Sequence, residues 1–567
     1  MLYGKAKTNS GRGDIMTEFE RQADDFIDNE RQFHLGFLPT EQSNPLTRSM
    51  EKDFKYSTVS GVRTLQRADR PVAEMAKRIL RSPEYAKLVA DGISTVGNGG
   101  RIVFSGCGAT GRLSILLESM WRQACAENPV MAGRADAVES IMTGGDFALV
   151  RSVEFFEDYA SFGRRQVADA GLTDRDMLVA ITEGGETSSV LGTAAEALDR
   201  GCKVFLLFNN PAKLLCEHLE RSRRIIEDPR VCVLDLYCGP MALAGSTRMQ
   251  ATTSEQLIAG SALEKIFHHF AKLPEVDYTP EFEKLLDELE ANAASIAGHI
   301  DFEAEVYARG GRVTYFADAF MLDIFTDTTE RSPTFMLPPF KRADDPVSPE
   351  PWAFVKNPLF DTEEVWRRNF RRAPRCLEWT PADYAAMGAS DKIRNAPPHI
   401  STADLFAIEI GNAPCPGRWT TGHDAAVLVG FDLDPTLASA FEPFAKQASQ
   451  RRTLTLGEGR DIDISCRGGA LDVMRHMAIK LVLNTVSTGT MVKLGRVSGN
   501  WMSWVDCTNK KLLDRGARLL VELAGCDYRA ACTALFAAMA EQRKSPAATE
   551  KRSPVQLALA ELTSGRG

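Results

Sequence analysis

Short apolar runs alternate with helical segments in the first half of the chain, and this alternation most constrains its fold. Residues 101–105, 176–182 and 203–208 are brief apolar runs, whereas residues 190–198 have the apolar spacing of a helix. Strands joined through helices run parallel, because the helix returns the chain to the same end of the sheet. The pattern therefore predicts an α/β fold in which helices cover both faces of a parallel sheet.

The second half of the chain looks like a divergent copy of the first. Strand candidates at 311–316 and 425–431 follow a helical stretch at 248–289, which we expect to be interrupted between Pro274 and Pro280. The polar N-terminal segment is expected to be extended. We divide the chain into an N-terminal segment at 1–55, a first domain at 56–290, a second domain at 291–505 with an insert at about 338–416, and a small helical C-terminal region at 506–567.

Charge and cysteine usage exclude several classes of protein. The 67 Lys and Arg residues against 76 Asp and Glu give a net charge of −9, which argues against a nucleic-acid binder. Apolar runs fall short of the ~18 residues of a membrane helix, and the first residues lack the apolar core of a signal peptide. We expect a cytoplasmic protein with no membrane partner. The 12 cysteines show neither metal-site nor disulfide spacing, so we expect no metal and no cofactor.

Three loops carry the candidate chemistry. Residues 106–112 read Gly-x-Gly-x-x-Gly at the start of a helix, where free amides and a positive partial charge suit a phosphate or form an ordinary tight turn. Residues 182–189 end in three consecutive hydroxyl side chains, which cap a helix or bind phosphate oxygens. A nicotinamide-binding fold does not need this second loop, so a phosphosugar fits better than a dinucleotide. Residues 245–249 form a third hydroxyl-bearing loop.

Several blocks of sequence together resemble a known family. They are Ser43–Arg48, the run from Gly144-Gly145-Asp146 through Glu154 to Glu157-Asp158, Gly245–Met249, Lys480–Gly489 and Thr508–Leu512. On these blocks the chain resembles the sugar isomerase (SIS) domain family, with N-acetylmuramic acid 6-phosphate etherase and the two-domain glucokinase regulatory protein as its most similar members. The resemblance covers about residues 40 to 525. It implies two tandem SIS domains, each a Rossmann-like parallel sheet sandwiched by helices.

The resemblance also implies a binding site for a hexose or amino-sugar 6-phosphate. The family pattern gives backbone amides at Gly108, Gly111 and Gly185, and hydroxyls at Thr110, Thr187, Ser188, Ser246 and Thr247. Lys480 from the second half would reach a phosphosugar held mainly by the first. Taken alone, a lysine at the start of an apolar helix more often keeps its charged head in water.

The expected reaction is less clear than the ligand. Glu157 matches one of the two catalytic glutamates of the etherases, but the other falls on Met120, and neighbouring Glu118 is rotated about 200° around the helix. Loss of a positioned acid or base costs about 10²–10⁴-fold in rate. Gln250 and Gln256 also stand where the family has lysines. We therefore expect a phosphosugar-binding protein that senses or regulates, with a protein partner that the sequence does not identify.

Two alternatives remain open at this point. The first is an enzyme, either an etherase-like lyase or an aldose–ketose isomerase, with Glu157, Glu183 or Glu186 as the reacting carboxylate. The second is a binder of a dinucleotide or nucleotide sugar at the loop of residues 106–112. The second is disfavoured because no acidic residue follows that loop at a strand end about 20 positions on.

Overall fold

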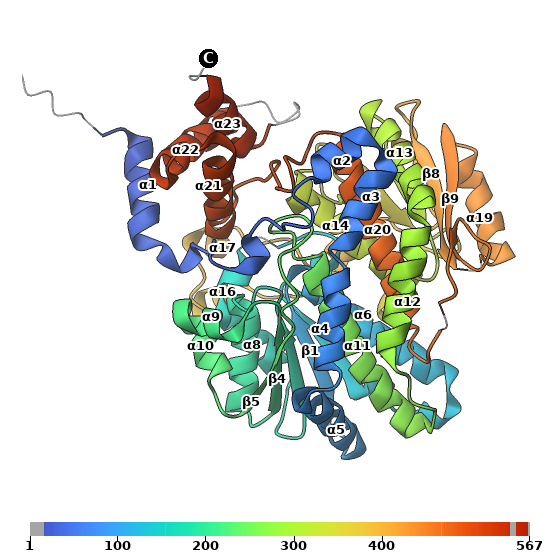
Figure 1. The fold of residues 1–567 in the computed structure, drawn as a ribbon. Coiled ribbons are helices and arrows are strands. Elements are labelled where there is room, and N and C mark those ends of the chain that lie inside the picture. The colour runs from blue at the N-terminus through green and yellow to red at the C-terminus, as the bar shows by residue number, and fades with distance from the viewer. Residues whose placement is uncertain (1–15, 154, 432, 467, 545–551, 565–567) are drawn as a thin grey trace, which may run out of the picture. The chain divides into compact units, whose positions relative to one another are not determined.

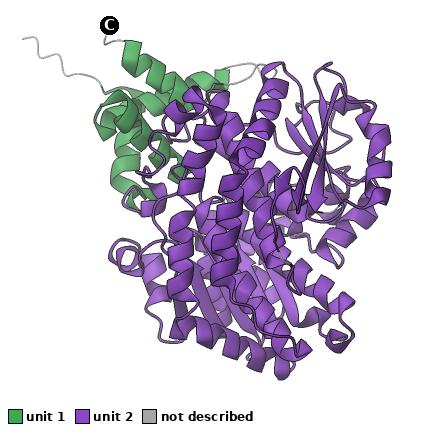
Figure 2. Ribbon diagram, turned by 45° about the vertical axis from the view of Figure 1, so that its right-hand side comes forward, with its two compact units in different colours: residues 1–35, 506–567 green, residues 36–505 purple. Residues whose placement is uncertain are grey.

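The computed structural model describes residues 16–153, 155–431, 433–466, 468–544 and 552–564. It divides into two compact units, the larger formed by Gly36–Val505 and the smaller by Met1–Leu35 together with Asp506–Gly567 (Figure 2). The larger unit contains both sheets and all the site residues predicted above. Among the described residues, no helix has both the length and the apolar character needed to cross a bilayer.

Five parallel strands form the first sheet, in the order β2-β1-β3-β4-β5. They are β1 (Ile102–Gly106), β2 (Val138–Met142), β3 (Met177–Ile181), β4 (Lys203–Phe208) and β5 (Val231–Asp235). Every residue of β1 and β3 is buried, as expected for strands covered on both faces. The helices between these strands are α6 (Gly108–Glu127), α7 (Ala160–Asp169), α8 (Ser188–Asp199), α9 (Ala212–His218) and α10 (Glu220–Ile226).

The second sheet repeats this topology. Its five parallel strands have the order β10-β9-β8-β6-β7, so its first strand again lies between its second and its third. They are β6 (Val313–Phe316), β7 (Ala353–Lys356), β8 (Ala425–Phe431), β9 (Gln450–Gly457) and β10 (Ile462–Asp463). Its helices are α14 (Met321–Phe335), α15 (Thr362–Phe370), α16 (Pro381–Ala386), α17 (Asp391–Asn395), α18 (Thr402–Phe406) and α19 (Pro435–Ala445). The predicted pair of parallel α/β layers is confirmed.

Long buried helices join the two lobes, which we define by their sheets. Helices α11 (Gln250–Ala271) and α20 (Val473–Lys493) contact each other and are buried around most of their circumference, so they lie in the interior (Figure 1). Helices α6 and α14 also contact each other. The remaining helices of this unit are α2 (Met50–Tyr56), α3 (Thr58–Arg67), α4 (Arg70–Ile79), α5 (Pro83–Gly97), α12 (Tyr278–Ala291) and α13 (Ala293–Ala308).

Helices form the smaller unit. They are α1 (Glu18–Asn29), α21 (Lys510–Ala524), α22 (Tyr528–Lys544) and α23 (Pro554–Ser564). The prediction of a helical C-terminal region is confirmed. The prediction that the N-terminal segment is extended is wrong over α1, where Thr17 and Glu20 form a capping box and Phe26 is buried. Residues 1–15 of that segment lie outside the described part of the chain.

Candidate functional site

The first glycine loop is a tight turn between β1 and α6. A Cβ atom on Gly106 would lie 2.4 Å from the backbone carbon of Thr110, and Gly108 has a φ of +56°, so both positions favour glycine. Gly111 follows Thr110 in α6 and lies against Met142. The Thr110 hydroxyl accepts from the Cys107 amide at 3.0 Å and donates to the Cys107 carbonyl at 2.8 Å. In this structure the predicted ligand hydroxyl of Thr110 therefore stabilises the turn itself.

The second loop follows β3, the neighbour of β1 in the sheet. Gly185 has a φ of +77°, and Thr187 is the N-cap residue of α8. The Thr187 hydroxyl accepts a hydrogen bond from the Thr182 hydroxyl at 3.1 Å, while Ser188 is half-buried at the first position of α8. Because the strand order reverses between β1 and β3, both loops meet where open parallel sheets bind ligands.

The third loop, before α11, is tied to the second lobe. Arg248 is buried and donates to Asp327 of α14 at 2.8 Å and to Asn484 of α20 at 3.0 Å. The hydroxyl of Ser246 is buried and has no hydrogen-bond partner in the described part of the protein, while Thr247 is half-buried. Buried hydroxyls are normally bonded, so Ser246 is suited to contact a ligand.

Lys480 reaches this third loop from α20. Its ammonium donates to the carbonyls of Arg248 at 3.1 Å and Met249 at 3.3 Å, and to the hydroxyl of Thr253 at 2.7 Å. Burial lowers the pKa of Lys480 to about 7, although Asp69 acts in the opposite direction. The structure thus brings Lys480 together with the loop of Ser246 and Thr247. None of its three acceptors belongs to the first glycine turn.

A carboxylate from the second lobe lies at the first glycine turn. Glu330 of α14 forms an ion pair with Arg112, whose side chain is fully buried at the start of α6. A Cβ atom on Gly108 would lie 3.9 Å from the Glu330 carboxylate. Sequence reasoning missed Glu330, because 218 residues separate it from Arg112 and no local pattern marks it.

The other predicted carboxylates have different surroundings. Glu157 lies half-buried in a short 3₁₀ turn, Phe156–Asp158, and Glu154 is outside the described residues. Glu183 is half-buried, and Glu186 is buried and paired with Arg221 at 3.1 Å. The contacts described above join none of these carboxylates to Lys480.

Met120 stands apart from the three loops. It lines a pocket whose lining among the described residues contains none of the predicted phosphosugar-binding residues. Glu118 is buried against Arg122, Arg372 and Arg375, in agreement with the expectation that it points elsewhere. Met120 supplies no carboxylate, whereas Glu330 places one beside the first glycine turn.

Comparisons with known proteins bear on the family of this chain. A family model described as "Glucokinase regulatory protein N-terminal SIS domain" matches residues 84–198. N-acetylmuramic acid 6-phosphate etherase from Yersinia pestis (strain Pestoides F) is 30% identical over 224 residues, which are 40% of this chain and 68% of the relative. N-acetylmuramic acid 6-phosphate etherase 1 from Bacillus licheniformis is 29% identical over 225 residues, 40% of this chain and 67% of the relative.

Among solved structures, tagatose-6-phosphate ketose/aldose isomerase from Escherichia coli is similar with a TM-score of 0.41 and 11% identity, over 78% of this chain and 95% of that one. The family assignment depends instead on the sequence matches, because a relative with 30% identity is covered over 68% of its length. Together with the matching family model, this identity and coverage show that the chain belongs to the SIS-domain family.

Proposed function

We propose that the protein binds a hexose or amino-sugar 6-phosphate between the three loops of the first lobe, and that it acts as a sensor or regulator. One observation carries the proposal. The Lys480 side chain of the second lobe is buried and donates to the carbonyl of Arg248 in the third loop. Two residues before Arg248, the buried hydroxyl of Ser246 has no hydrogen-bond partner among the described residues. A phosphate ester would supply an acceptor for the Ser246 hydroxyl and a negative charge for the ammonium of Lys480, whose three donors bond to acceptors of the protein in this structure.

The phosphate would lie at the amino ends of α6 and α8, where backbone amides and the helix dipoles favour negative charge. Ser188, Ser246 and Thr247 would donate to its oxygens or to the sugar. Glu330 would accept from a sugar hydroxyl at the glycine turn. Because both lobes contribute to the site, a bound ligand would change the contact between the lobes. Such a change suits a sensor, and a protein partner would recognise it.

Replacement of the lysine tests the proposal. Lys480→Ala should weaken binding of a hexose 6-phosphate by about ten- to hundredfold, because it removes a charge-assisted contact. Binding of the unphosphorylated sugar should change much less. Lys493→Ala is a matched control, since Lys493 ends the same helix and pairs with Asp301 at the surface. Thermal shift and calorimetry with both sugars would measure this, and equal losses for both would contradict the proposal.

An enzyme is the second candidate, and the position of Glu330 favours it. A carboxylate beside the glycine turn is a candidate acid or base for lactate elimination from a 3-lactyl sugar phosphate, or for aldose–ketose isomerisation. Deuterium exchange at carbon 2 of the bound sugar phosphate, or released lactate, would support the enzyme. Glu330→Gln should then abolish exchange and retain binding. Binding without exchange in the unmodified protein supports the sensor.

A further inference from the structure

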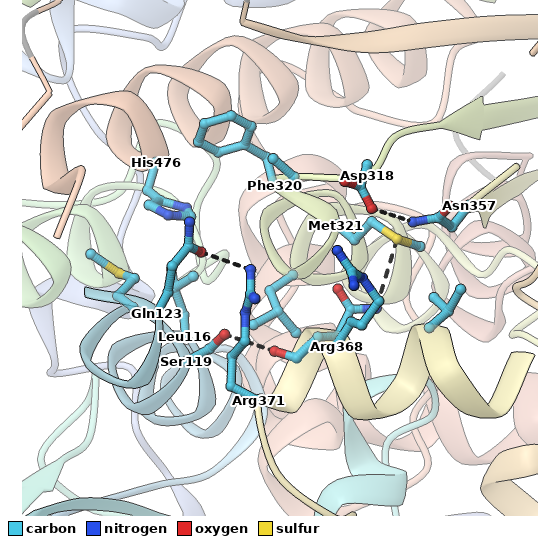
Figure 3. Close-up of a pocket in the computed structure, with 15 residues that line it drawn as sticks. Leu116, Ser119, Gln123, Asp318, Phe320, Met321, Asn357, Arg368, Arg371 and His476 are labelled. Atoms are coloured by element: carbon cyan, nitrogen blue, oxygen red, sulfur yellow. Dashed lines mark hydrogen bonds between the residues drawn. The ribbon is translucent and has the colours of Figure 1, made fainter. Parts of the chain in front are cut away.

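The pocket that Met120 lines lies where two strands of the second sheet end (Figure 3). Asp318 and Phe320 follow β6, and Asn357 follows β7. In this sheet the strand order reverses between β6 and β8, whereas the pocket is lined by residues that follow β6 and β7. The pocket has a cavity volume of about 160 Å³ and is open to solvent.

Three basic side chains line this pocket from two helices and a helix end. Arg368 lies on α15, Arg371 follows the last residue of α15, and His476 lies on α20. The Arg368 guanidinium stacks over Phe360 at 4.0 Å from the ring centroid. Arg371 donates to the side-chain oxygen of Gln123 at 3.0 Å. Since a guanidinium has five N–H donors, these contacts leave donors for a ligand.

The charges around these groups favour an added anion. Burial lowers the pKa of Arg371, and repulsion from Arg368 lowers it further. Burial opposes charge on His476, but its contact with Asp323 at 2.6 Å outweighs this and raises the pKa. The lining carboxylate of Asp318 is held by Asn357 at 2.7 Å. An anion between the arginines would relieve their repulsion.

Two of the lining residues lie at helix ends. Arg371 is the C-cap residue of α15 and has a φ of +54°, the left-handed conformation in which helices commonly end. Phe320 is the N-cap residue of α14 and has a φ of +64°.

We propose that this pocket binds a small phosphate ester that carries hydroxyl groups, at a site separate from that of the proposed function. Arg368 and Arg371 would donate to the phosphate oxygens, since a guanidinium binds two oxygens at once. Asp318, Asn357 and Gln123 would contact the hydroxyls.

Two substitutions isolate the arginines in the full-length protein. The test variant is Arg368→Gln with Arg371→Asn, since asparagine tolerates the left-handed conformation. Arg367→Gln is the matched control, because Arg367 is the neighbouring residue of α15 and pairs with Glu363 at 2.9 Å. Calorimetry with glucose 6-phosphate and with inorganic phosphate would give stoichiometry and affinity, with thermal unfolding as a check of the fold.

We expect two binding events per chain for glucose 6-phosphate in the unmodified protein and in the control. The test variant should retain one and weaken the other by about tenfold or more for each guanidinium removed. Unchanged titrations of the test variant would overturn the inference. So would an event that responds to inorganic phosphate and not to the ester.

Failure of the proposed function would look different. A single event that survives Lys480→Ala and is lost in the arginine variant supports this pocket and contradicts the first-lobe site. A single event with the opposite behaviour supports the first-lobe site and overturns this inference.

Discussion

The amine of Lys480 is buried and lies near two ionisable side chains, those of Asp69 and Glu255. Burial lowers its pKa to about 7, and burial raises the pKa of Asp69 to about 6. Burial, with repulsion from Glu183 as the next cause, also raises the pKa of Glu255 well above its usual range. Near neutral pH the protein can therefore add or release a proton at this site at low cost. A bound dianion would favour the protonated amine.

Phosphosugar binding should consequently take up a proton at pH 7.5 and weaken as pH rises from 7 to 9. Calorimetry in two buffers of different ionisation enthalpy measures this uptake. Lys480→Met should abolish most of it, and an unchanged uptake in that variant would contradict the assignment. Without ligand, the unfolded chain binds more protons between the folded pKa of about 7 and the ordinary 10.5, so the contribution of Lys480 to stability rises with pH over this window.

At the scale of elements, Glu118 of helix α6 forms ion pairs with the segment that follows α15. Glu118 is buried and pairs with Arg122 at 2.9 Å and with Arg372 and Arg375 at 3.0 Å. It also accepts from the Ser140 hydroxyl at 2.6 Å, which links it to β2. Each arginine also has a second carboxylate partner, respectively Asp136, Asp146 and Glu139.

Glu118→Ala should lower the free energy of unfolding by about 1–3 kcal/mol, because the buried Ser140 hydroxyl loses its acceptor and the arginines lose one of their carboxylates. Glu127→Ala, at the exposed end of the same helix, should change it by less than about 0.5 kcal/mol. Urea unfolding of both variants checks this, and similar midpoints would show that the arginines find other partners.

The elements that sequence analysis identified are those with a continuous local signal. β3 and β4 are unbroken apolar runs, and the interruption between α11 and α12 agrees with the expected break between Pro274 and Pro280. β2 contains a glutamate and a serine, and β10 has two residues, so neither carries such a signal. β7 lies inside the predicted insert, and its four residues carry little strand signal because Pro351, Trp352 and Pro358 flank them.

The parts of the candidate site that have a local sequence pattern were predictable, and the parts that depend on tertiary packing were not. The three loops are local patterns, and each lies at a strand or helix end as expected. The contact of Glu330 with Arg112 depends on the packing of α14 against α6, which no spacing in the sequence encodes. The sequence also did not decide whether the Thr110 hydroxyl caps the turn or binds a ligand, because both roles have the same sequence pattern.

At the scale of the whole molecule, buried charges join the two lobes. Asp327 of α14 accepts from Arg248 at 2.8 Å and from Arg331 at 2.9 Å, and all three side chains are buried. Arg331 continues the network to Glu303 of α13. Since the Arg248 carbonyl also accepts from Lys480, the same network holds the third loop in place.

Asp327→Asn should lower the free energy of unfolding by about 3–5 kcal/mol, because two buried guanidiniums lose their shared carboxylate. It should also weaken phosphosugar binding, since Arg248 then no longer fixes the loop of Ser246. Asp301→Asn is the control, because Asp301 pairs with Lys493 at the surface, where an ion pair contributes about 0–1 kcal/mol. Urea unfolding and calorimetry would separate the two effects. A stable Asp327→Asn protein with unchanged binding would mean that the lobes are held by apolar packing alone and that the loop keeps its position without the buried charge.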